Sequence, residues 1–479
     1  MNAPAKAVSF RRLTRRALSI GMVRAADKAM QMLLPIVLVR CLDTATFGEY
    51  RLLWLVVGTV MTIATLNMAG GLNFFLPRSD ARGKRLYVHQ TMLFLFASSL
   101  FFAALTGPWN PLLPATLEPL QKYGAEVPAF VALWVAAVLL DHLPTIDERV
   151  RWQANATLAM SLLRVGLIAW GAFATGDLGV MLWLMMAAVA AKLVLLLVYV
   201  ARYHGLGGPW FERRAFAEQF THVAPFGLAG ALYGLRGQAD QWIAAALFSL
   251  HSFAAFSIAA VLHPLVLIFR RSVVEAFLPN MSRLQARGDV AGMMDLNSRG
   301  NVMVGALLYP ALAFVFAFTE DIVTVVYTAA YLEAASVMRV YIVGMVVLVL
   351  EVGSVVLLLR QGGFSFRVNL IALVLSVAVS GALALTVGLA GAAAGSVVSV
   401  LLDRTLMLRR ISTEVGIPVR KLQDWRGLLI ALGYAIASAA LIRTVVDLAL
   451  EGPPLARLAA GAAGLALVYA AILWRWRAK

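Results

Sequence analysis

The sequence predicts an all-α integral membrane protein, because apolar residues dominate it, charged residues are few, and apolar segments of membrane-spanning length recur along it. Of its 479 residues, 61% are hydrophobic and only 14% are charged, whereas an ordinary soluble domain is about 25% charged. A membrane-spanning helix needs about 20 apolar residues, and about fourteen segments satisfy that requirement. These predicted spans are 18–40, 51–76, 86–107, 128–147, 154–175, 178–201, 223–249, 252–279, 300–320, 337–359, 367–389, 391–411, 427–449 and 454–475.

Lysine and arginine are distributed unequally between the two sets of connections that join these spans. The chain has 41 Lys+Arg against 25 Asp+Glu, a formal net charge of +16. One set of connections is strongly basic, and the other contains little beyond Arg40, Arg51, Lys122 and Arg457. Because basic loops stay in the cytoplasm, both termini are predicted to be cytoplasmic. Short basic clusters between apolar runs are not a nucleic-acid-binding stripe, so we expect no nucleic-acid partner.

No pattern in the sequence is typical of a metal site, a disulfide or a catalytic group. Cys41 is the only cysteine, so no intrachain disulfide can form. The histidines are scattered and lack the HxxxH and HExxH spacings of metal sites. The longest predicted outer connection, 108–127, is rich in proline and offers little that could catalyse a reaction. We therefore expect no cofactor, no metal and no enzymatic activity, which disfavours a membrane glycan polymerase or ligase.

Two stretches of the sequence resemble each other and predict an internal repeat. Arg24 and Asp27 begin the first copy and Arg236 and Asp240 begin the second, and each copy then reaches a Phe-Leu-Pro sequence and a basic loop. Both copies start on the same side of the membrane, so the repeat is parallel, with two six-helix bundles around a central cationic cavity and a C-terminal helix pair. The predicted segments are a basic cytoplasmic segment (1–17), an N-terminal bundle (18–201), a cytoplasmic linker with an interfacial helix (202–222), a C-terminal bundle (223–411), a basic cytoplasmic loop (412–426), and the helix pair with its basic tail (427–479).

Four basic side chains, Arg24, Lys28, Arg236 and Arg270, lie inside predicted spans. Each costs about 2.5–3.5 kcal/mol at the centre of a lipid-exposed helix, so we expect them to face water or a bound anion. Arg24 and Lys28 share one helix face at i,i+4 spacing and repel each other. A pyrophosphate between them would relieve this repulsion. The alternative is a local ion-pair cluster that includes the adjacent Asp27.

The second copy of the repeat offers two of these cations, each with an alternative role. Arg236 and Asp240 have i,i+4 spacing, so Arg236 either pairs with Asp240 or contacts a substrate. Arg271 and Glu275 have the same spacing and can pair, which leaves Arg270 directed elsewhere. Arg270 is therefore the better phosphate-binding candidate of the two adjacent arginines.

Further charged residues complete the set of candidates. Arg51 lies near the predicted outer interface, where it either contacts a substrate or extends harmlessly into the headgroup layer. Glu351 has no partner nearby in the sequence, so it either binds a coupling cation or forms a salt bridge to another helix. Asp27 and Asp240 are the other candidates for coupling, to Na⁺, to H⁺ or through the membrane potential.

Three segments resemble motifs of a known family. Residues 39–50, Val-Arg-Cys-Leu-Asp-Thr-Ala-Thr-Phe-Gly-Glu-Tyr, resemble the first-loop pattern of bacterial polysaccharide exporters and O-antigen flippases. Segments 225–240 and 277–289 resemble that family's motifs in helices seven and eight. The resemblance implies the multidrug, oligosaccharidyl-lipid and polysaccharide exporter superfamily. Related lipid II flippases place arginines of helices one, two and eight in a central cavity, which implies that role for Arg24, Arg51 and Arg270.

The resemblance also implies a function. It implies a flippase that moves a polyprenyl-pyrophosphate-linked oligosaccharide, such as an O-antigen or exopolysaccharide repeat unit, across the bacterial inner membrane by alternating access. The expected partners are this glycan lipid, membrane lipids, and proteins of polysaccharide polymerisation and export. The alternative is a cation-coupled multidrug or metabolite antiporter of the same fold. The basic excess argues against this alternative, because such antiporters often carry cationic drugs.

Overall fold

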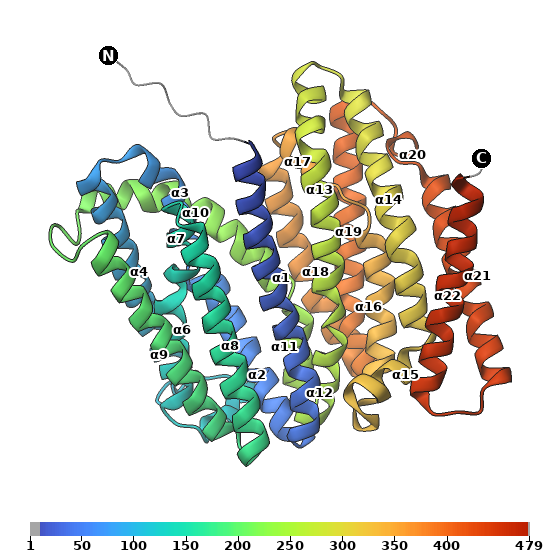
Figure 1. Cartoon of the computed structure of the whole chain (residues 1–479), viewed down its shortest axis with the longest axis horizontal. Helices are drawn as coiled ribbons and strands as arrows, with labels where there is room; N and C mark the ends of the chain where they lie inside the picture. The colour runs from blue at the N-terminus through green and yellow to red at the C-terminus, as the bar shows by residue number, and fades with distance from the viewer. Residues whose placement is uncertain (1–9, 478–479) are drawn as a thin grey trace. The chain divides into compact units, whose positions relative to one another are not determined.

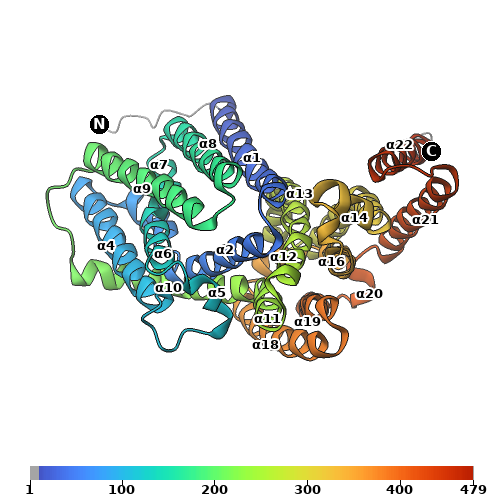
Figure 2. The ribbon, with the colours of Figure 1, turned by 90° about the horizontal axis from the view of Figure 1, so that it is seen from below.

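The structure is a computed structural model that describes residues 10–477, and within that range it describes side chains except those of 10–24, 264–265 and 470–477. The described residues form helices joined by turns and contain no strand. The chain divides into two compact units, Met1–Gly234 (unit 1) and Leu235–Lys479 (unit 2). Figure 1 labels the helices, and Figure 2 shows many of them nearly end-on. The predicted all-helical fold class is confirmed.

Unit 1 contains the long helices of the first half of the chain and the short helices that interrupt or connect them. Its elements are α1 (Phe10–Cys41), α2 (Thr44–Ala64), α3 (Met68–Phe75), η1 (Leu76–Arg78), α4 (Ala81–Thr106), η2 (Ala115–Leu117), α5 (Glu118–Gln121), α6 (Glu126–Ala136), η3 (Ala137–Asp141), α7 (Leu143–Ile146), α8 (Val150–Thr175), α9 (Leu178–Tyr203) and most of α10 (Arg213–Arg236).

Unit 2 begins near the end of α10 and continues to the C-terminus. Its further elements are α11 (Ala239–Leu247), α12 (Leu250–Ala259), α13 (Leu262–Ala286), α14 (Val290–Ala317), α15 (Thr319–Ile322), η4 (Val323–Tyr327), η5 (Ala329–Tyr331), α16 (Ala334–Leu348), α17 (Gly353–Leu358), α18 (Gly362–Val387), α19 (Leu389–Val415), α20 (Val419–Leu422), α21 (Trp425–Ala449) and α22 (Pro454–Arg477).

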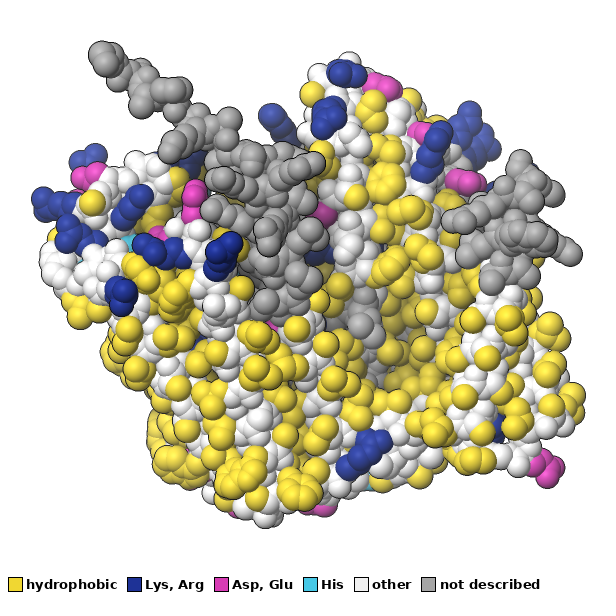
Figure 3. Space-filling model, viewed as in Figure 1, with side chains coloured by type: hydrophobic (Ala, Val, Ile, Leu, Met, Phe, Trp, Pro, Cys, Tyr) yellow, Lys and Arg dark blue, Asp and Glu magenta, His cyan; other side chains and the backbone are white. Residues whose placement is uncertain are grey.

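The apolar helices of both units are long enough to span a bilayer. In the described part of the chain, 9 helical segments meet the length and hydropathy of a membrane span, and three shorter helices are also apolar. On the face drawn in Figure 3, hydrophobic side chains cover the middle of the helices, while Lys and Arg gather mainly at the upper edge of the view. The chain is therefore a multi-pass membrane protein, as its composition predicts.

Every predicted span overlaps a helix, but several of these spans are interrupted. The second span breaks between α2 and α3, and the fourth changes from α6 through η3 to α7. In unit 2, the seventh breaks between α10 and α11, the eighth between α12 and α13, and the tenth between α16 and α17. Hydropathy and length alone do not predict these five interruptions. The second and fourth helices of each six-helix set are both interrupted, which agrees with a parallel repeat.

The linker between the predicted bundles also differs from its prediction. An interfacial helix was expected within 202–222, but α9 continues to Tyr203 and residues 204–212 contain no helix. Residues 213–222 instead form the first part of α10, which runs without interruption into the predicted seventh span. Arg213 and Arg214 therefore begin the same helix that continues to Arg236.

Close packing explains the break between α2 and α3. Leu66 and Asn67 have positive φ angles of 38° and 58°, so helix hydrogen bonding stops there. Gly227 of α10 packs directly on the Leu66 backbone, and a Cβ at Gly227 would overlap the Leu66 carbonyl group. Gly230, one turn later, has open space around its Cα. Residue 227 must therefore be glycine for α10 to approach the Leu66 backbone, whereas a larger residue fits at position 230.

Caps define the start of α2 and fix the boundary of the span. The Asp43 carboxylate accepts hydrogen bonds from the amides of Ala45 and Thr46, at 2.9 and 3.0 Å, and from the Thr46 hydroxyl at 2.6 Å. The hydrogen bonds from Thr46 lower the pKa of Asp43, because they favour the ionised carboxylate. Asp43 is thus the N-cap of α2, which places the Phe-Gly-Glu-Tyr run from Phe47 onward within the helix.

Candidate functional site

The predicted site residues fall into separate clusters within the two units. Asp27 and Lys28 lie on α1 and Arg51 on α2, whereas Arg236, Asp240, Arg270 and Glu351 lie in unit 2. The predicted Arg24 belongs to α1, but its side chain lies outside the described residues. The contacts of each cluster show which of these charged side chains are paired with other protein groups and which are available to bind a ligand.

The α1 cluster joins α1 to α8. Asp27 accepts a hydrogen bond from Gln31 at 2.9 Å and a short one from Ser161. The Arg164 guanidinium lies 3.6 Å from the same carboxylate. Among the described side chains, Asp27 therefore has its basic partner on α8 and not in its neighbour Lys28. The sequence gives no local signal for the partnership of Arg164 with Asp27, because the two residues lie far apart along the chain.

Lys28 differs from its neighbour Asp27 because it has no hydrogen-bond or ion-pair partner among the side chains that the structure describes. It is half-buried. An ammonium group on a membrane-spanning helix loses much of its hydration unless water or an anion reaches it. Lys28 is thus available to a ligand, which Arg164 is not.

Glu49 holds the connection between α4 and α6, and it was not among the site residues predicted from the sequence. It is buried, and it accepts bonds from Lys122 Nζ at 2.7 Å and the Tyr123 hydroxyl at 2.6 Å. Burial and the bond to Glu49 raise the pKa of Tyr123, so the hydroxyl stays protonated and donates. Arg51 is half-buried on the same helix. The signal for Glu49 was its position inside the Phe-Gly-Glu-Tyr motif, where a charged residue must face protein or water.

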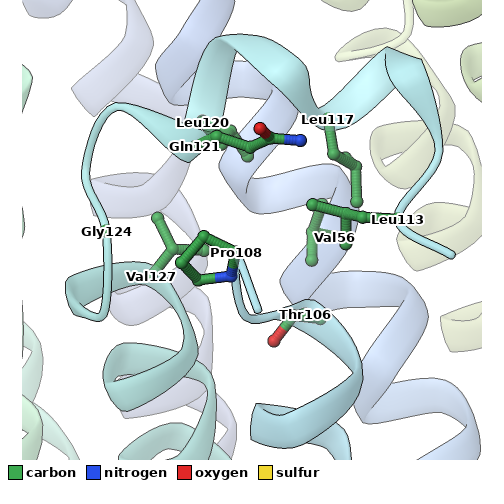
Figure 4. Close-up of a pocket in the computed structure, with 9 residues that line it drawn as sticks. All are labelled: Val56, Thr106, Pro108, Leu113, Leu117, Leu120, Gln121, Gly124 and Val127. Carbon is green, nitrogen blue, oxygen red and sulfur yellow. The ribbon is translucent and has the colours of Figure 1, made fainter. Parts of the chain in front are cut away.

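A small cavity lies beside this connection, as Figure 4 shows. Its lining comes from α2, the end of α4, the connection 107–125 and the start of α6. The labelled residues are Val56, Thr106, Pro108, Leu113, Leu117, Leu120, Gln121, Gly124 and Val127. Thr106 and Gln121 are its polar side chains, and no charged residue lines it. The cavity is therefore too apolar to bind a phosphate group.

All three guanidinium nitrogens of Arg236 donate hydrogen bonds to residues of unit 2. Its Nε donates to the Ser399 hydroxyl at 2.8 Å, and its Nη1 donates to Asn369 at 2.8 Å and to Asp403 at 3.2 Å. Its Nη2 donates to the Ser399 carbonyl at 3.2 Å, and the side chain is 10% exposed. These contacts join the end of α10 to α18 and α19. They favour the structural alternative for Arg236.

The pairing of Arg236 with Asp240, one of the two alternatives for Arg236, does not form; Arg236 pairs with Asp403 instead. Helix α10 ends at Arg236 and α11 begins at Ala239, so the i,i+4 geometry of one continuous helix is lost between them. Asp240 is 2% exposed and accepts bonds from the Tyr341 hydroxyl at 2.8 Å, its neighbour's amide at 2.8 Å, and Ser396 at short distance. Among the described residues, no lysine or arginine forms a salt bridge with it. Asp240 is thus a buried carboxyl group that hydrogen-bond donors satisfy without a cation.

Arg270 contacts the interruption between α16 and α17. Its Nε lies 3.1 Å from Glu351 Oε2, and its Nη1 donates to the Leu348 carbonyl at 2.9 Å. The salt bridge confirms the second alternative for Glu351, an ion pair to another helix. The expected pair of Arg271 with Glu275 also forms, at 2.8 Å, and both of its side chains are well exposed. Arg270 therefore points away from Arg271, into the helix interruption.

The backbone of that interruption is satisfied by asparagine side chains of α14. Asn301 Oδ1 accepts from the Glu351 amide at 2.9 Å, and Asn297 Nδ2 donates to the Glu351 carbonyl at 3.1 Å. The Glu351 carboxylate accepts from the Ser354 amide at 2.9 Å, at the start of α17. Non-helical backbone at membrane depth needs such partners, because lipid cannot supply them. Sequence reasoning could not detect these side chains, since neutral Asn residues give no signal in a hydropathy pattern.

A further charge cluster ties the last helices of unit 2 to its core. Arg443 of α21 donates to Asp321 at 2.5 Å and to Asp447 at 2.8 Å. Arg457 of α22 donates to Asp447 at 2.5 Å and lies 3.6 Å from Asp321. Four charges thus neutralise one another across α15, α21 and α22, which supports a structural role for Arg443.

Comparisons with known proteins identify the fold and the family. Residues 37–336 match the sequence model of a family described as "Polysaccharide biosynthesis protein". No curated protein sequence matches the chain significantly. Among solved structures, the chain is similar to the lipid II flippase MurJ in an inward closed conformation, with a TM-score of 0.68, 12% identity, and coverage of 96% of this chain and 99% of that one.

Multidrug transporters of the MATE family share the same fold. An inward-facing MATE transporter of the MOP superfamily gives a TM-score of 0.60 at 11% identity and covers 81% of this chain and 95% of that chain. The MATE multidrug transporter DinF-BH gives a TM-score of 0.56 at 14% identity, with coverage of 87% of this chain and 99% of that chain. At such low identities the similarity shows a common fold, and the substrate has to be argued from family and site.

Proposed function

The chain belongs to the polysaccharide biosynthesis protein family, and from this premise we propose that it is a flippase for a polyprenyl-pyrophosphate-linked oligosaccharide. The observation that carries the proposal is the set of intramembrane cations on a fold shared with the lipid II flippase MurJ. A lipid-linked pyrophosphate is an anion that must cross a hydrocarbon layer, and arginine and lysine are the side chains that recognise phosphate. No covalent chemistry is required, which fits a transporter.

The contacts rank the candidate phosphate-binding residues. Lys28 has no partner among the described side chains, and Arg270 has partners at Nε and Nη1 but none among the described residues at Nη2. Arg236 donates to Ser399, Asn369 and Asp403, so its role in the proposal is to hold unit 2 together and not to bind substrate. Arg24 and Arg51 remain phosphate-binding candidates in unit 1 on the family resemblance. Alternating access would carry the bound headgroup across the membrane.

Asp240 is the proposed coupling group. A buried carboxyl group without a basic partner either takes up a proton or binds a small cation, because its charge is otherwise uncompensated. The oxygens of Asp240, Tyr341 and Ser396 converge there from α11, α16 and α19. The Glu351 carboxylate is neutralised by Arg270 and Asp27 by Arg164, which makes both weaker coupling candidates.

The cellular setting follows from the same proposal. We place the protein in the bacterial inner membrane with both termini in the cytoplasm, since the basic connections gather on that side. Its pathway would be lipopolysaccharide or exopolysaccharide biosynthesis, and its partners would include the polymerase and export proteins that receive the flipped unit.

A cation-coupled antiporter is the second candidate. Its support is the fold similarity to MATE transporters and the buried, cation-free Asp240. A cationic drug, however, would meet Lys28 and Arg270 instead of acidic side chains. The flippase accounts for these basic residues and the antiporter does not.

Mass spectrometry of polyprenyl-linked lipids from a deletion strain tests the two candidates, with the surface polymer measured in parallel. A flippase predicts accumulation of a completed lipid-linked oligosaccharide and loss of its surface polymer. An unchanged lipid pool together with a normal surface polymer would contradict the flippase and favour drug or metabolite export.

A further inference from the structure

Among the described residues, Arg270 is bound through Nε and Nη1 but not through Nη2, whereas the other buried arginine, Arg236, also donates through Nη2. A guanidinium has five N–H donors. Arg270 directs one of them to Glu351 and one to the Leu348 carbonyl, whereas Arg236 donates to four acceptor contacts. Its side chain is 15% exposed, and none of its nitrogens is among the fully buried atoms left without a partner. Arg270 thus keeps donors that a phosphate oxygen can reach.

Glu351 is built so that its carboxylate can leave Arg270 without unfolding the helix interruption. Asn301 and Asn297 hold the Glu351 amide and carbonyl, so the backbone does not depend on the ion pair. Oε1 binds the Ser354 amide, while Oε2 faces Arg270. The two functions of the side chain are therefore divided between its two oxygens, and only one of them contacts the arginine.

The charges around Glu351 leave Arg270 as its only cationic partner among the described residues. On α13, Arg271 is paired with Glu275. On α14, the facing side chains are the neutral Asn297 and Asn301. On α19, Asp403 pairs with Arg236 and Arg404. A bare guanidinium here would be costly when no ligand is bound, because its hydration is incomplete.

We propose that Glu351 is an intramolecular anion that occupies Arg270 in the unloaded protein, and that the pyrophosphate of the substrate displaces it. This inference rests on the proposed function. Glu351 then sets the affinity of the site, because the ligand must compete with a carboxylate that is always present. Only the fraction of protein with a released Arg270 binds at full strength, so the apparent dissociation constant equals the intrinsic one divided by that fraction.

Glu351→Gln tests the proposal directly. Glutamine keeps an oxygen for the Ser354 amide but carries no charge to hold Arg270. Binding of undecaprenyl pyrophosphate to the full-length protein in lipid nanodiscs should become about tenfold tighter. A merely structural role for Glu351 would weaken binding or leave it unchanged, so a gain in affinity distinguishes the two roles.

Matched variants show whether the gain acts through Arg270. Glu275→Gln frees the neighbouring Arg271 in the same way and should leave binding unchanged. Arg270→Ala should weaken binding, and adding Glu351→Gln to it should produce no further change. Glu351→Asp keeps the charge but shortens the side chain, so it should give an intermediate gain and serves as a second variant if the glutamine protein folds poorly.

The outcomes separate this inference from the proposed function. Unchanged or weaker binding in Glu351→Gln and Glu351→Asp, with the wild type binding normally, contradicts the inference alone. A gain that persists in the Arg270→Ala background also contradicts it. Absence of binding in the wild type and in every variant contradicts both the inference and the lipid-pyrophosphate function.

Discussion

The basic side chains inside the predicted spans differ in how many hydrogen-bond and ion-pair partners they have. That number indicates whether each one has a structural role or can bind a ligand. Arg236 has four acceptor contacts from α18 and α19, Arg270 has two contacts, and Lys28 has none among the described side chains. All three cations look alike in the sequence, since each interrupts an apolar segment. Membrane burial makes every unsatisfied charge costly, so the least satisfied charge is the best candidate for a ligand.

Removing Arg236 should destabilise the protein more than removing any exposed arginine. Arg236→Ala leaves Asn369 and Ser399 without their donor and breaks a salt bridge with buried Asp403, which costs about 3–5 kcal/mol for a buried pair. Thermal unfolding in detergent measures the loss. Arg271→Ala, on an exposed pair, is the control and should change the midpoint little. Equal midpoints for the two variants would refute the structural role of Arg236.

Neutralising Lys28 should reduce ligand binding without loss of stability. Lys28→Gln removes one charge-assisted contact to phosphate, so the dissociation constant for undecaprenyl pyrophosphate should rise about tenfold. Lys192→Gln provides the comparison, because Lys192 is already paired with Asp141 at 2.7 Å. A larger effect on affinity from Lys192→Gln than from Lys28→Gln would argue against Lys28 as a substrate contact.

Neutralising Asp240 should uncouple transport from ion gradients. Asp240→Asn keeps an acceptor for Tyr341 and Ser396 but can neither take up a proton nor balance a cation. Transport in proteoliposomes with imposed pH and Na⁺ gradients should then lose its gradient dependence. Asp447→Asn, whose carboxylate is 43% exposed, is the control. A gradient response equal to that of the wild type would exclude Asp240 as the coupling group.

The helices were predictable, whereas their interruptions were not. Hydropathy and length locate the spans because each apolar segment must cross the same thickness of lipid. The interruption at Glu351 depends on Asn297 and Asn301, which are neutral and lie 54 and 50 residues away. The break at Leu66 depends on Gly227 of a different helix. Such stabilising groups come from distant parts of the chain, so no local window contains them.

Packing at the α2–α3 break gives a prediction at the level of the elements. Gly227→Ala should destabilise unit 1, because the added methyl group would overlap the Leu66 backbone, which cannot rotate away as a side chain can. Gly230→Ala lies one turn along the same helix in open space and should be neutral or slightly stabilising. Thermal midpoints of the two variants measure the contrast. A Gly230→Ala midpoint at or below that of Gly227→Ala would contradict this packing.

At the level of the whole chain, composition and the parallel repeat predict the class of protein but not the partners of its charges. The predicted all-helical membrane fold agrees with the structure and with the fold of MurJ. The candidate cations were predicted from the free-energy cost of placing a charge in lipid, because a charged residue inside an apolar span can be recognised in the sequence. Their partners were not predicted, since Arg236 and Asp403 are 167 residues apart. The substrate class therefore rests on the family, and the ranking of site residues rests on contacts.

The central claim is that this protein moves a pyrophosphate-linked glycan lipid across a bilayer. The most direct measurement is the transbilayer movement of a fluorescent undecaprenyl-pyrophosphate-linked oligosaccharide in proteoliposomes, followed by the accessibility of its sugar to an impermeant reagent. We predict movement that requires the wild-type protein and is slowed in Lys28→Gln and in Arg270→Ala. Movement no faster than in protein-free vesicles would contradict the claim.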